Sequence, residues 1–108
     1  MEKILMVEDE AGLRDWFEAM LRETGREVDW ISSGDLAQQL LMDTARHWDL
    51  IVSDFDLHSR LTGLDLWQLS QKRQPETPFL LISGVPDHVF HSMVRSGEAC
   101  PEIGRAHV

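Results

Sequence analysis

Short apolar runs alternate with segments of helical periodicity along this chain, and this alternation constrains the fold more than any other feature. The runs are strand-sized and cover residues 3–7, 28–30, 50–53 and 79–83. The third run is continuous enough to be buried on both faces, as the central strand of a parallel sheet is. The second run alternates with acidic residues, which is typical of a half-covered strand or a strand near an edge.

Amphipathic segments fill the intervals between these runs. The first predicted helix carries its apolar side chains on one face: Leu13, Trp16, Phe17, Met20 and Leu21. The second is expected to open at Ser33 and to turn three leucines inward: Leu36, Leu40 and Leu41. Thr62 and Gly63 start a third helix, and Pro86 starts a fourth. The alternation predicts a doubly wound α/β fold, in which right-handed crossovers place helices on both faces of a parallel sheet.

Composition limits the classes of protein to which the chain can belong. Its 108 residues provide for one domain, and the 43% hydrophobic content suits a globular protein. The net charge of −9 argues against binding of nucleic acid by this domain, because phosphates would be repelled. Cys100, the single cysteine, cannot form an internal disulfide, and neither a signal peptide nor a bilayer-spanning run is expected. We therefore expect a cytoplasmic location and no membrane partner.

Acidic and hydroxyl side chains follow the predicted strands at their carboxyl ends. Glu8 and Asp9 follow the first strand, Asp54 the third and Ser83 the fourth. Reactive groups of doubly wound sheets gather at this edge, and the strand order 2-1-3-4(-5) would make the first and third strands neighbours. Two carboxylates about 4 Å apart repel by roughly 4 kcal/mol at an effective dielectric near 20. We therefore expect a hard cation, Mg²⁺, to be bound among the carboxylates.

Such a cluster also suits phosphoryl transfer. A carboxylate can attack phosphorus and form an acyl phosphate, while a bound cation positions the group and neutralises its charge. The hydroxyl of Ser83 could then donate to a phosphoryl oxygen and report the modification to the neighbouring helix. The remaining candidates have simpler interpretations. The four tryptophans are expected to be core or half-buried residues, and the five histidines, which lack paired metal-ligand spacing, are expected at the surface.

Four segments together resemble the receiver domain of two-component response regulators, the CheY-like superfamily: residues 3–10, 49–54, 63–66 and 78–84. The resemblance extends to about Gly97. It implies a flavodoxin-like strand order and a switch domain that is not a turnover enzyme. It also implies Mg²⁺ as cofactor, a sensor histidine kinase or phosphotransfer protein as partner, and a downstream effector domain. It assigns these roles: Asp54 as phosphoacceptor, Asp9 as direct metal ligand, Glu8 as ligand through water, the Asp56 carbonyl as a further ligand, and Ser83 as switch hydroxyl.

The chain departs from the family pattern at two places. Residues 55–61 are expected to form a polar loop. Within it, His58 stands where the family usually has a proline, and the loop to Gly63 is longer than usual. No lysine follows Lys72, although the family expects one at the end of a fifth strand, and Arg105 lies near that position. We therefore expect the fifth strand and fifth helix to be missing or degraded. Residues 1–101 are interpreted as an incomplete receiver domain, and residues 102–108 as a non-native tail, because they match the translation of a common sequencing-adapter DNA.

Two alternative functions are considered. Residues 51–56 also fit the strand and Asp-x-Asp signature of phosphohydrolases similar to the haloacid dehalogenase family, although that signature should follow the first strand. The second alternative is a pseudo-receiver, an interaction module that retains the fold without phosphorylation. The missing lysine favours this reading, whereas the complete acidic set argues against it.

Overall fold

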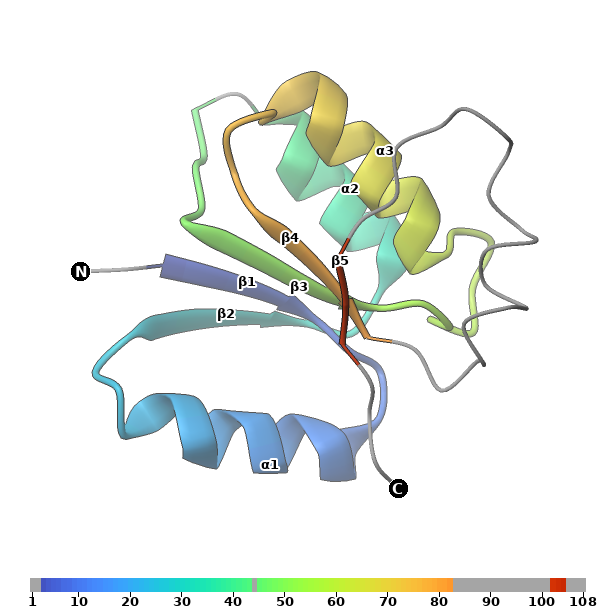
Figure 1. Cartoon of the computed structure of the whole chain (residues 1–108). Coiled ribbons are helices and arrows are strands. Elements are labelled where there is room, and N and C mark those ends of the chain that lie inside the picture. Colours follow the sequence, from blue (N-terminus) through green and yellow to red (C-terminus); the bar gives the residue numbers. More distant parts are fainter. Residues whose placement is uncertain (1–2, 44, 83–101, 105–108) are drawn as a thin grey trace.

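The computed structural model describes residues 3–43, 45–82 and 102–104 and shows one sheet between two layers of helices (Figure 1). The elements in chain order are β1 Lys3–Val7, α1 Ala11–Arg22, β2 Glu27–Ile31, α2 Gly34–Met42, β3 Leu50–Asp54, α3 Gly63–Arg73, β4 Phe79–Ile82 and β5 Glu102–Gly104. The sheet order is β2-β1-β3-β4-β5, and all its pairings are parallel. Helix α1 covers one face and helices α2 and α3 cover the other. The predicted doubly wound, flavodoxin-like order is confirmed.

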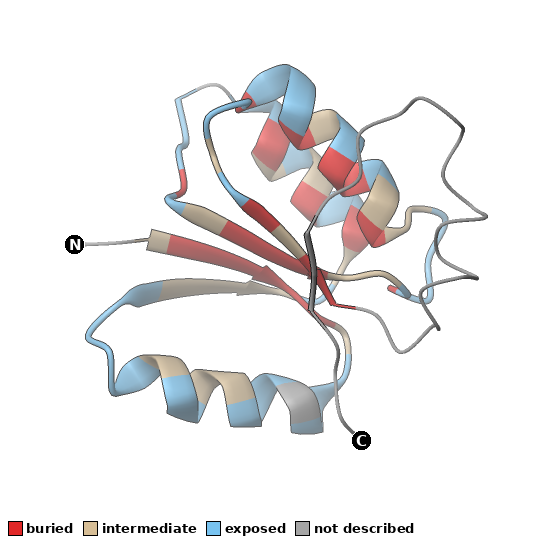
Figure 2. Ribbon diagram, in the orientation of Figure 1, coloured by how far each residue is buried: buried red, intermediate tan, exposed pale blue. Residues whose placement is uncertain are grey.

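Side chains alternate between the two faces of the inner strands and so divide the core. Leu5 and Val7 of β1 pack with residues of α2 and α3, whereas Ile4 and Met6 pack with Phe17 and Leu21 of α1. Figure 2 shows that buried residues run along β1, β3 and β4. The larger core lies on the α2–α3 side: Leu5, Val7, Ala37, Leu41, Trp48, Ile51, Leu57, Leu66, Trp67, Phe79 and Leu81. The smaller one consists of Ile4, Met6, Val52 and Ile82. Strands β1 and β3 are therefore held from both faces, which fixes the positions of their carboxyl ends.

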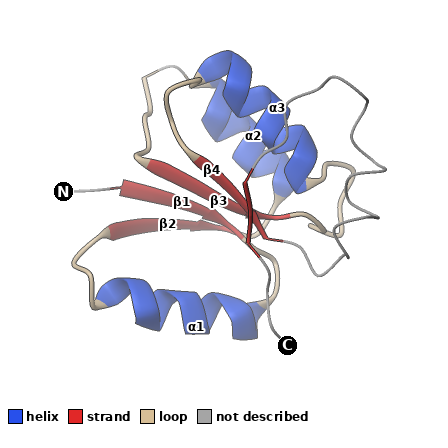
Figure 3. Ribbon diagram, viewed as in Figure 1, coloured by secondary structure: helices blue, strands red, loops and turns tan. Residues whose placement is uncertain are grey.

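Local signals in the sequence set the starts of α2 and α3 (Figure 3). The Ser33 side chain accepts a hydrogen bond from the Leu36 amide, and Thr62 and Asp65 form a reciprocal capping box at the start of α3. Gly63 packs so closely against β3 that a Cβ there would collide with the carbonyl oxygen of Asp54. The predicted helix starts are confirmed, and α3 is held directly beside the end of β3.

Helix α1 is less buried than its sequence predicts. Phe17 and Leu21 are half-buried against the smaller core, but Trp16 is 59% exposed and Met20 is 44% exposed. The prediction that Trp16 is a core or half-buried residue is therefore wrong, whereas Trp48 and Trp67 are buried and Trp30 is intermediate. The described part of the chain covers one side of the apolar face of α1 and leaves these two side chains in solvent.

Two further predictions require correction. Leu36, expected on the inner face of α2, is 46% exposed, because Ala37 and Leu41 form the buried stripe instead. The loop after β3, expected to be polar, places Leu57 in the larger core with 3% exposure. This buried leucine anchors the loop that follows Asp54.

The fifth strand is short. Glu102–Gly104 pairs with β4 in the register Leu80↔Glu102 to Ile82↔Gly104, so β4 is not an open edge over these residues. The segment was expected to be a poor strand, and it supplies three residues. The helix predicted from Pro86 and the switch residue Ser83 lie outside the described residues. Within the part that is described, no helix has the length and apolar character needed to cross a bilayer.

What we call the amino-end network consists of Lys3 at the start of β1, Trp48 and Asp49 before β3, Thr77 before β4, and Asp29 in the middle of β2. Trp48 Nε1 donates to Asp29 Oδ2 at 3.2 Å, and Lys3 Nζ lies 3.6 Å from the same oxygen. The Lys3 amide donates to Asp49 Oδ2 at 2.7 Å, and Thr77 Oγ1 donates to the Trp48 carbonyl at 3.1 Å. These contacts tie together the segments that enter β1, β3 and β4.

Candidate metal and phosphoacceptor site

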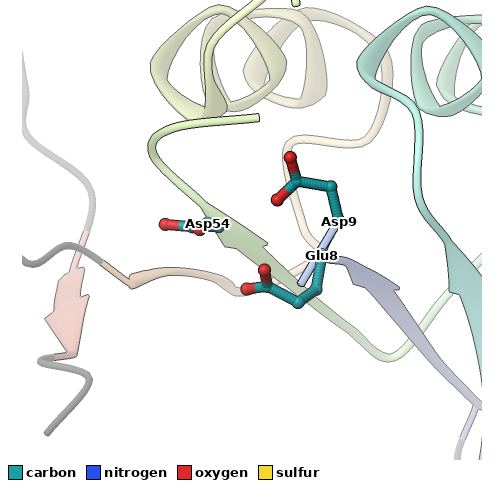
Figure 4. A group of neighbouring side chains, drawn as sticks. All are labelled: Glu8, Asp9 and Asp54. Carbon is teal, nitrogen blue, oxygen red and sulfur yellow. The ribbon is translucent and has the colours of Figure 1, made fainter. Parts of the chain in front are cut away.

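Three carboxylates meet at the opposite end of the sheet. Val7 of β1 pairs with Ser53 of β3, so Glu8, Asp9 and Asp54 leave adjacent strands at the same level. One oxygen from each carboxylate lies within 4.8 Å of the others (Figure 4). We call these residues the acidic cluster. The predicted convergence of Glu8, Asp9 and Asp54 is confirmed.

Glu8 is the most buried member of the acidic cluster, with 2% exposure. Its Oε1 accepts a hydrogen bond from the Glu10 amide at 2.9 Å, whereas its Oε2 is buried without a partner among the described residues. Burial raises the pKa of Glu8 to about 7; the Glu10 hydrogen bond opposes this rise, and the charges of Asp54 and Asp9 add to it. A buried carboxylate oxygen without a donor is costly unless water or a cation reaches it.

Asp54 ends β3 and is half-buried. Burial raises its pKa, hydrogen bonds from the backbone at Asp56 and Phe55 oppose the rise, and the neighbouring charge of Asp9 adds to it. The side chain of Asp9 is 22% exposed, so the cluster is open to solvent on its side. Asp54 is thus an accessible carboxylate whose orientation is fixed by backbone donors.

The donor set fits magnesium. All three side chains supply hard oxygen ligands, their oxygens are close enough to share an ion, and Oε2 of Glu8 lacks a partner among the described residues. Burial first, and then mutual repulsion, raise the pKa values of Glu8 and Asp54, and a divalent cation would offset both effects. Asp56, the fourth predicted ligand, follows two residues after Asp54; its side chain is 70% exposed, and the role of its carbonyl stays a prediction.

The loop after β3 brings to the cluster one residue that was not among the predicted site residues. His58, expected only at the surface, is 67% exposed, yet its Nδ1 lies 4.0 Å from Asp9 Oδ2 and 3.4 Å from Asp56 Oδ1. Its backbone has a φ of 50°, a left-handed conformation that histidine adopts more readily than most residues. Its position where the family usually has proline was the available signal. Ser83, the remaining predicted site residue, lies outside the described residues.

Comparison with known proteins gives one consistent result. Residues 4–97 match the family model of the response regulator receiver domain. The chain is 35% identical over 81 residues to response regulator protein PmrA of Pseudomonas aeruginosa. That match includes 75% of this chain and 35% of PmrA, so the chain spans about a third of that relative. The similarity therefore concerns one domain of a longer protein.

Solved structures agree with the sequence comparison. A response regulator receiver protein from Sinorhizobium medicae has a TM-score of 0.81 at 27% identity, covering 96% of this chain and 81% of that one. The receiver domain of the sensor histidine kinase PA1611 from Pseudomonas aeruginosa, solved with a magnesium ion coordinated in its active site cleft, has a TM-score of 0.67 at 25% identity; the match covers 75% of this chain and 66% of that one. The phosphohydrolase alternative is not supported, because Asp54 follows the third strand and these matches are receivers. The chain belongs to the response regulator receiver domain family of two-component signalling.

Proposed function

We propose that this domain is switched by transfer of a phosphoryl group to Asp54 in the presence of Mg²⁺. The observation that carries the proposal is the acidic cluster, in which a half-buried carboxylate at the end of β3 lies beside Glu8 and Asp9. Carboxylates that lie this close together can bind a cation and a phosphoryl group. Without either ligand, they destabilise the fold.

Magnesium would be held by Asp9 and Asp54 directly, by Glu8 through water and by the carbonyl of Asp56. When bound, it supplies positive charge for the phosphoryl oxygens. The magnesium ion in the cleft of the PA1611 receiver supports this assignment, as does the unpartnered Oε2 of Glu8. Asp9, whose side chain is 22% exposed, leaves room for the waters that Mg²⁺ retains.

Asp54 acts as the nucleophile. One carboxylate oxygen forms a bond to the phosphorus of a phosphohistidine donor while the bond from phosphorus to the imidazole nitrogen breaks. The electron pair of that bond leaves with the nitrogen, which takes a proton from solvent. Backbone donors at Asp56 and Phe55 favour the ionised form of the Asp54 carboxylate against the effect of burial, and they orient its oxygens. Positioning of this kind is the main contribution that a protein makes to phosphoryl transfer.

The phosphoryl group then changes the charge at the end of β3. It adds about −1.5 to −2 charges at neutral pH, enough to attract a hydroxyl donor and reorganise the loop that carries it. Ser83 is our proposed donor, since it follows Ile82, the last residue of β4 and the register partner of Asp54. The signal would pass to the segment that follows β4, where the sequence predicts the fourth helix.

The donor is proposed to be a sensor histidine kinase or a phosphotransfer protein, and the output to be an effector domain elsewhere in the full protein. Membership in the receiver family supports both partners as a class. Because the net charge of −9 would repel nucleic acid, an output that acts on nucleic acid would use another domain. A cytoplasmic location follows from this role as a proposal.

Intact mass spectrometry after incubation with acetyl phosphate and Mg²⁺ tests the proposal. The wild-type chain should gain the mass of one phosphoryl group, and Asp54→Asn should gain none. Asp15→Asn, which changes an exposed acid on α1, is the matched control and should be phosphorylated as the wild type is. No mass gain in the wild-type chain would favour the pseudo-receiver, and an equal gain in Asp54→Asn would reject Asp54 as acceptor.

A further inference from the structure

His58 approaches the acidic cluster from a different segment than the three carboxylates. Glu8 and Asp9 follow β1 and Asp54 ends β3, whereas His58 belongs to the loop between β3 and α3. Its Nδ1 lies 4.0 Å from Asp9 Oδ2 and 3.4 Å from Asp56 Oδ1. The cluster therefore has a nitrogen donor next to Asp9, a carboxylate that solvent reaches.

Three contacts hold the loop in this conformation. The His58 amide donates to Asp56 Oδ1 at 3.0 Å, which turns the backbone back toward the cluster. Leu57 is buried in the larger core, and Arg60 pairs with Asp35 of α2 at 2.9 Å. The loop is thus anchored on both sides of His58, although the imidazole ring itself is exposed.

The distances suit a shared ion. Two ligands that bind one metal ion at about 2.1 Å lie between roughly 3 and 4.2 Å apart in octahedral geometry, depending on whether they are adjacent or opposite. The separation of 4.0 Å between His58 Nδ1 and Asp9 Oδ2 falls in this interval. The ligand atoms that lie within 4.8 Å of one another are those of Glu8, Asp9 and Asp54, so the exposed His58 ring has to turn toward the ion to bind it. An independent observation indicates that the cluster takes a ligand: Oε2 of Glu8 is buried, belongs to a residue with 2% exposure, and has no partner among the described residues.

We propose that His58 is a nitrogen ligand of this metal site, so that the site binds borderline divalent ions such as Ni²⁺ and Zn²⁺ more tightly, relative to Mg²⁺, than carboxylates alone would. The proposal rests on the proposed function, because it assumes that the acidic cluster holds a cation. It assigns to His58 a role in metal choice, which an exposed loop residue would not otherwise have.

The chemistry of the donors gives the expected direction. Imidazole suits Zn²⁺, Ni²⁺, Cu²⁺ and Fe²⁺, whereas Mg²⁺ prefers oxygen ligands and keeps its waters. A nitrogen next to Asp9 therefore increases affinity for the first group and adds little for Mg²⁺. Replacement of His58 should change the ratio of the two affinities, and a purely structural role of the loop would change both affinities equally.

Isothermal titration of the full chain with Mg²⁺ and separately with Ni²⁺ measures this ratio. His58→Asn removes the imidazole and retains a residue that tolerates a positive φ. We expect it to weaken Ni²⁺ binding at the cluster by at least about tenfold and Mg²⁺ binding by less than about threefold. His47→Asn removes an exposed imidazole elsewhere, and Arg60→Ala removes the loop's ion pair without touching the ring; neither should change the ratio.

The imidazole itself provides a spectroscopic readout. In the ¹⁵N NMR spectrum of the metal-free chain, the Nδ1 resonance of His58 is identified as the one that is absent from His58→Asn. This resonance should shift when Zn²⁺ is added to the wild-type chain and should not shift when Zn²⁺ is added to Asp9→Asn. An unchanged Ni²⁺ to Mg²⁺ ratio in His58→Asn, with Mg²⁺ still bound, would overturn the role of His58 alone. If the wild-type chain bound neither ion and Asp9→Asn behaved identically, the proposed function would fail first.

Discussion

In the amino-end network, carboxylates lie beside donors, whereas in the acidic cluster carboxylates lie beside one another. Asp29 accepts from Trp48 Nε1 and lies 3.6 Å from Lys3 Nζ, and Asp49 accepts from the Lys3 amide. Glu8 and Asp54, at the other end of the same strands, have raised pKa values caused first by burial. Carboxylates of the amino-end network thus lie beside hydrogen-bond donors, whereas those of the acidic cluster lie beside other carboxylates at the carboxyl ends of β1 and β3.

The difference separates structural from functional use of polar groups. Satisfied hydrogen bonds of partly buried groups contribute about 0.5–1.5 kcal/mol each to stability and need no ligand. Carboxylates that are buried together reduce stability and are retained where a ligand compensates. The amino ends of the strands therefore hold the fold together, and the carboxyl ends provide the site. Each of the following changes tests this contrast between the two ends of the sheet.

The largest effect is expected from Trp48→Ala in the amino-end network. The ring is 4% exposed in the larger core, and its Nε1 donates to Asp29. Truncation should lower the free energy of unfolding by about 3–5 kcal/mol, because it creates a cavity and removes a donor. Denaturant unfolding measures this loss. Trp16→Ala, at the 59% exposed tryptophan of α1, is the control; a similar loss for both would contradict the assignment of Trp48 to the core.

Glu8→Gln should change stability in the opposite direction. The amide oxygen can still accept from the Glu10 amide, while the buried charge beside Asp54 and Asp9 is removed. At a pH well above the pKa of Glu8 and without divalent ions, we expect the free energy of unfolding to rise by about 1–2 kcal/mol. Glu76→Gln changes an exposed acid and should have little effect. A destabilised Glu8→Gln would show that this end of the sheet is structural as well.

The stability of the metal-free chain should fall as the pH rises, which is opposite in sign to the pH dependence that a salt-bridged carboxylate gives. The pKa of Glu8 is raised from 4.5 to about 7, so between these values the folded chain binds more protons than the unfolded chain. Stability from this group is complete below 4.5 and is lost as the pH rises through about 7. The melting temperature of the metal-free chain should therefore fall by several degrees over this interval, and the fall should be smaller in Glu8→Gln. A rise in melting temperature over the same interval would contradict this account.

The smallest effect is expected at the ion pair of Lys3 and Asp29. Both side chains are more than a third exposed, at 39% and 36%, and their atoms are 3.6 Å apart. Lys3→Met should change the free energy of unfolding by less than about 1 kcal/mol, because solvent screens the pair. Denaturant unfolding at low and high salt checks this value. A loss comparable to that of Trp48→Ala would mean that charge, and not burial of Trp48, holds the amino-end network.

Periodic and terminal signals made most of the fold predictable. The continuous run at residues 50–53 indicated a strand covered on both faces. Ser33 and Thr62 marked helix starts, because a cap is a local interaction. The convergence of Glu8, Asp9 and Asp54 followed from strand order, since a parallel sheet places all carboxyl ends at one edge. These features depend on near neighbours or on topology.

Features that depend on tertiary context were missed. Periodicity gave Trp16 an inner position on α1, but exposure depends on which neighbouring element covers the helix. The polar composition of the loop after β3 concealed the buried Leu57. His58 was correctly assigned to the surface, but its approach to Asp9 was not predicted, because a left-handed backbone conformation leaves no periodic trace in the sequence. The loop therefore had to be seen in three dimensions.

The carboxyl-terminal tail stays a separate proposal. We propose that residues 102–108 are non-native and that the receiver sequence proper continues differently after Pro101. The pairing of Glu102–Gly104 with β4 does not bear on this, because a β-ladder uses backbone groups that any extended segment possesses. Reading the gene at its genomic locus is the test; a native locus that encodes these seven residues without adapter DNA would reject the proposal.

Calorimetric titration with Mg²⁺ at a pH well above the pKa of Glu8 tests most directly whether the acidic cluster shares one cation. We expect one saturable site in the wild-type chain and an affinity at least about tenfold lower in Asp9→Asn, which removes one carboxylate of the acidic cluster. Asp15→Asn should bind as the wild type does. Mg²⁺ binding that is equally tight in Asp9→Asn, or absent from the wild-type chain, would contradict this expectation.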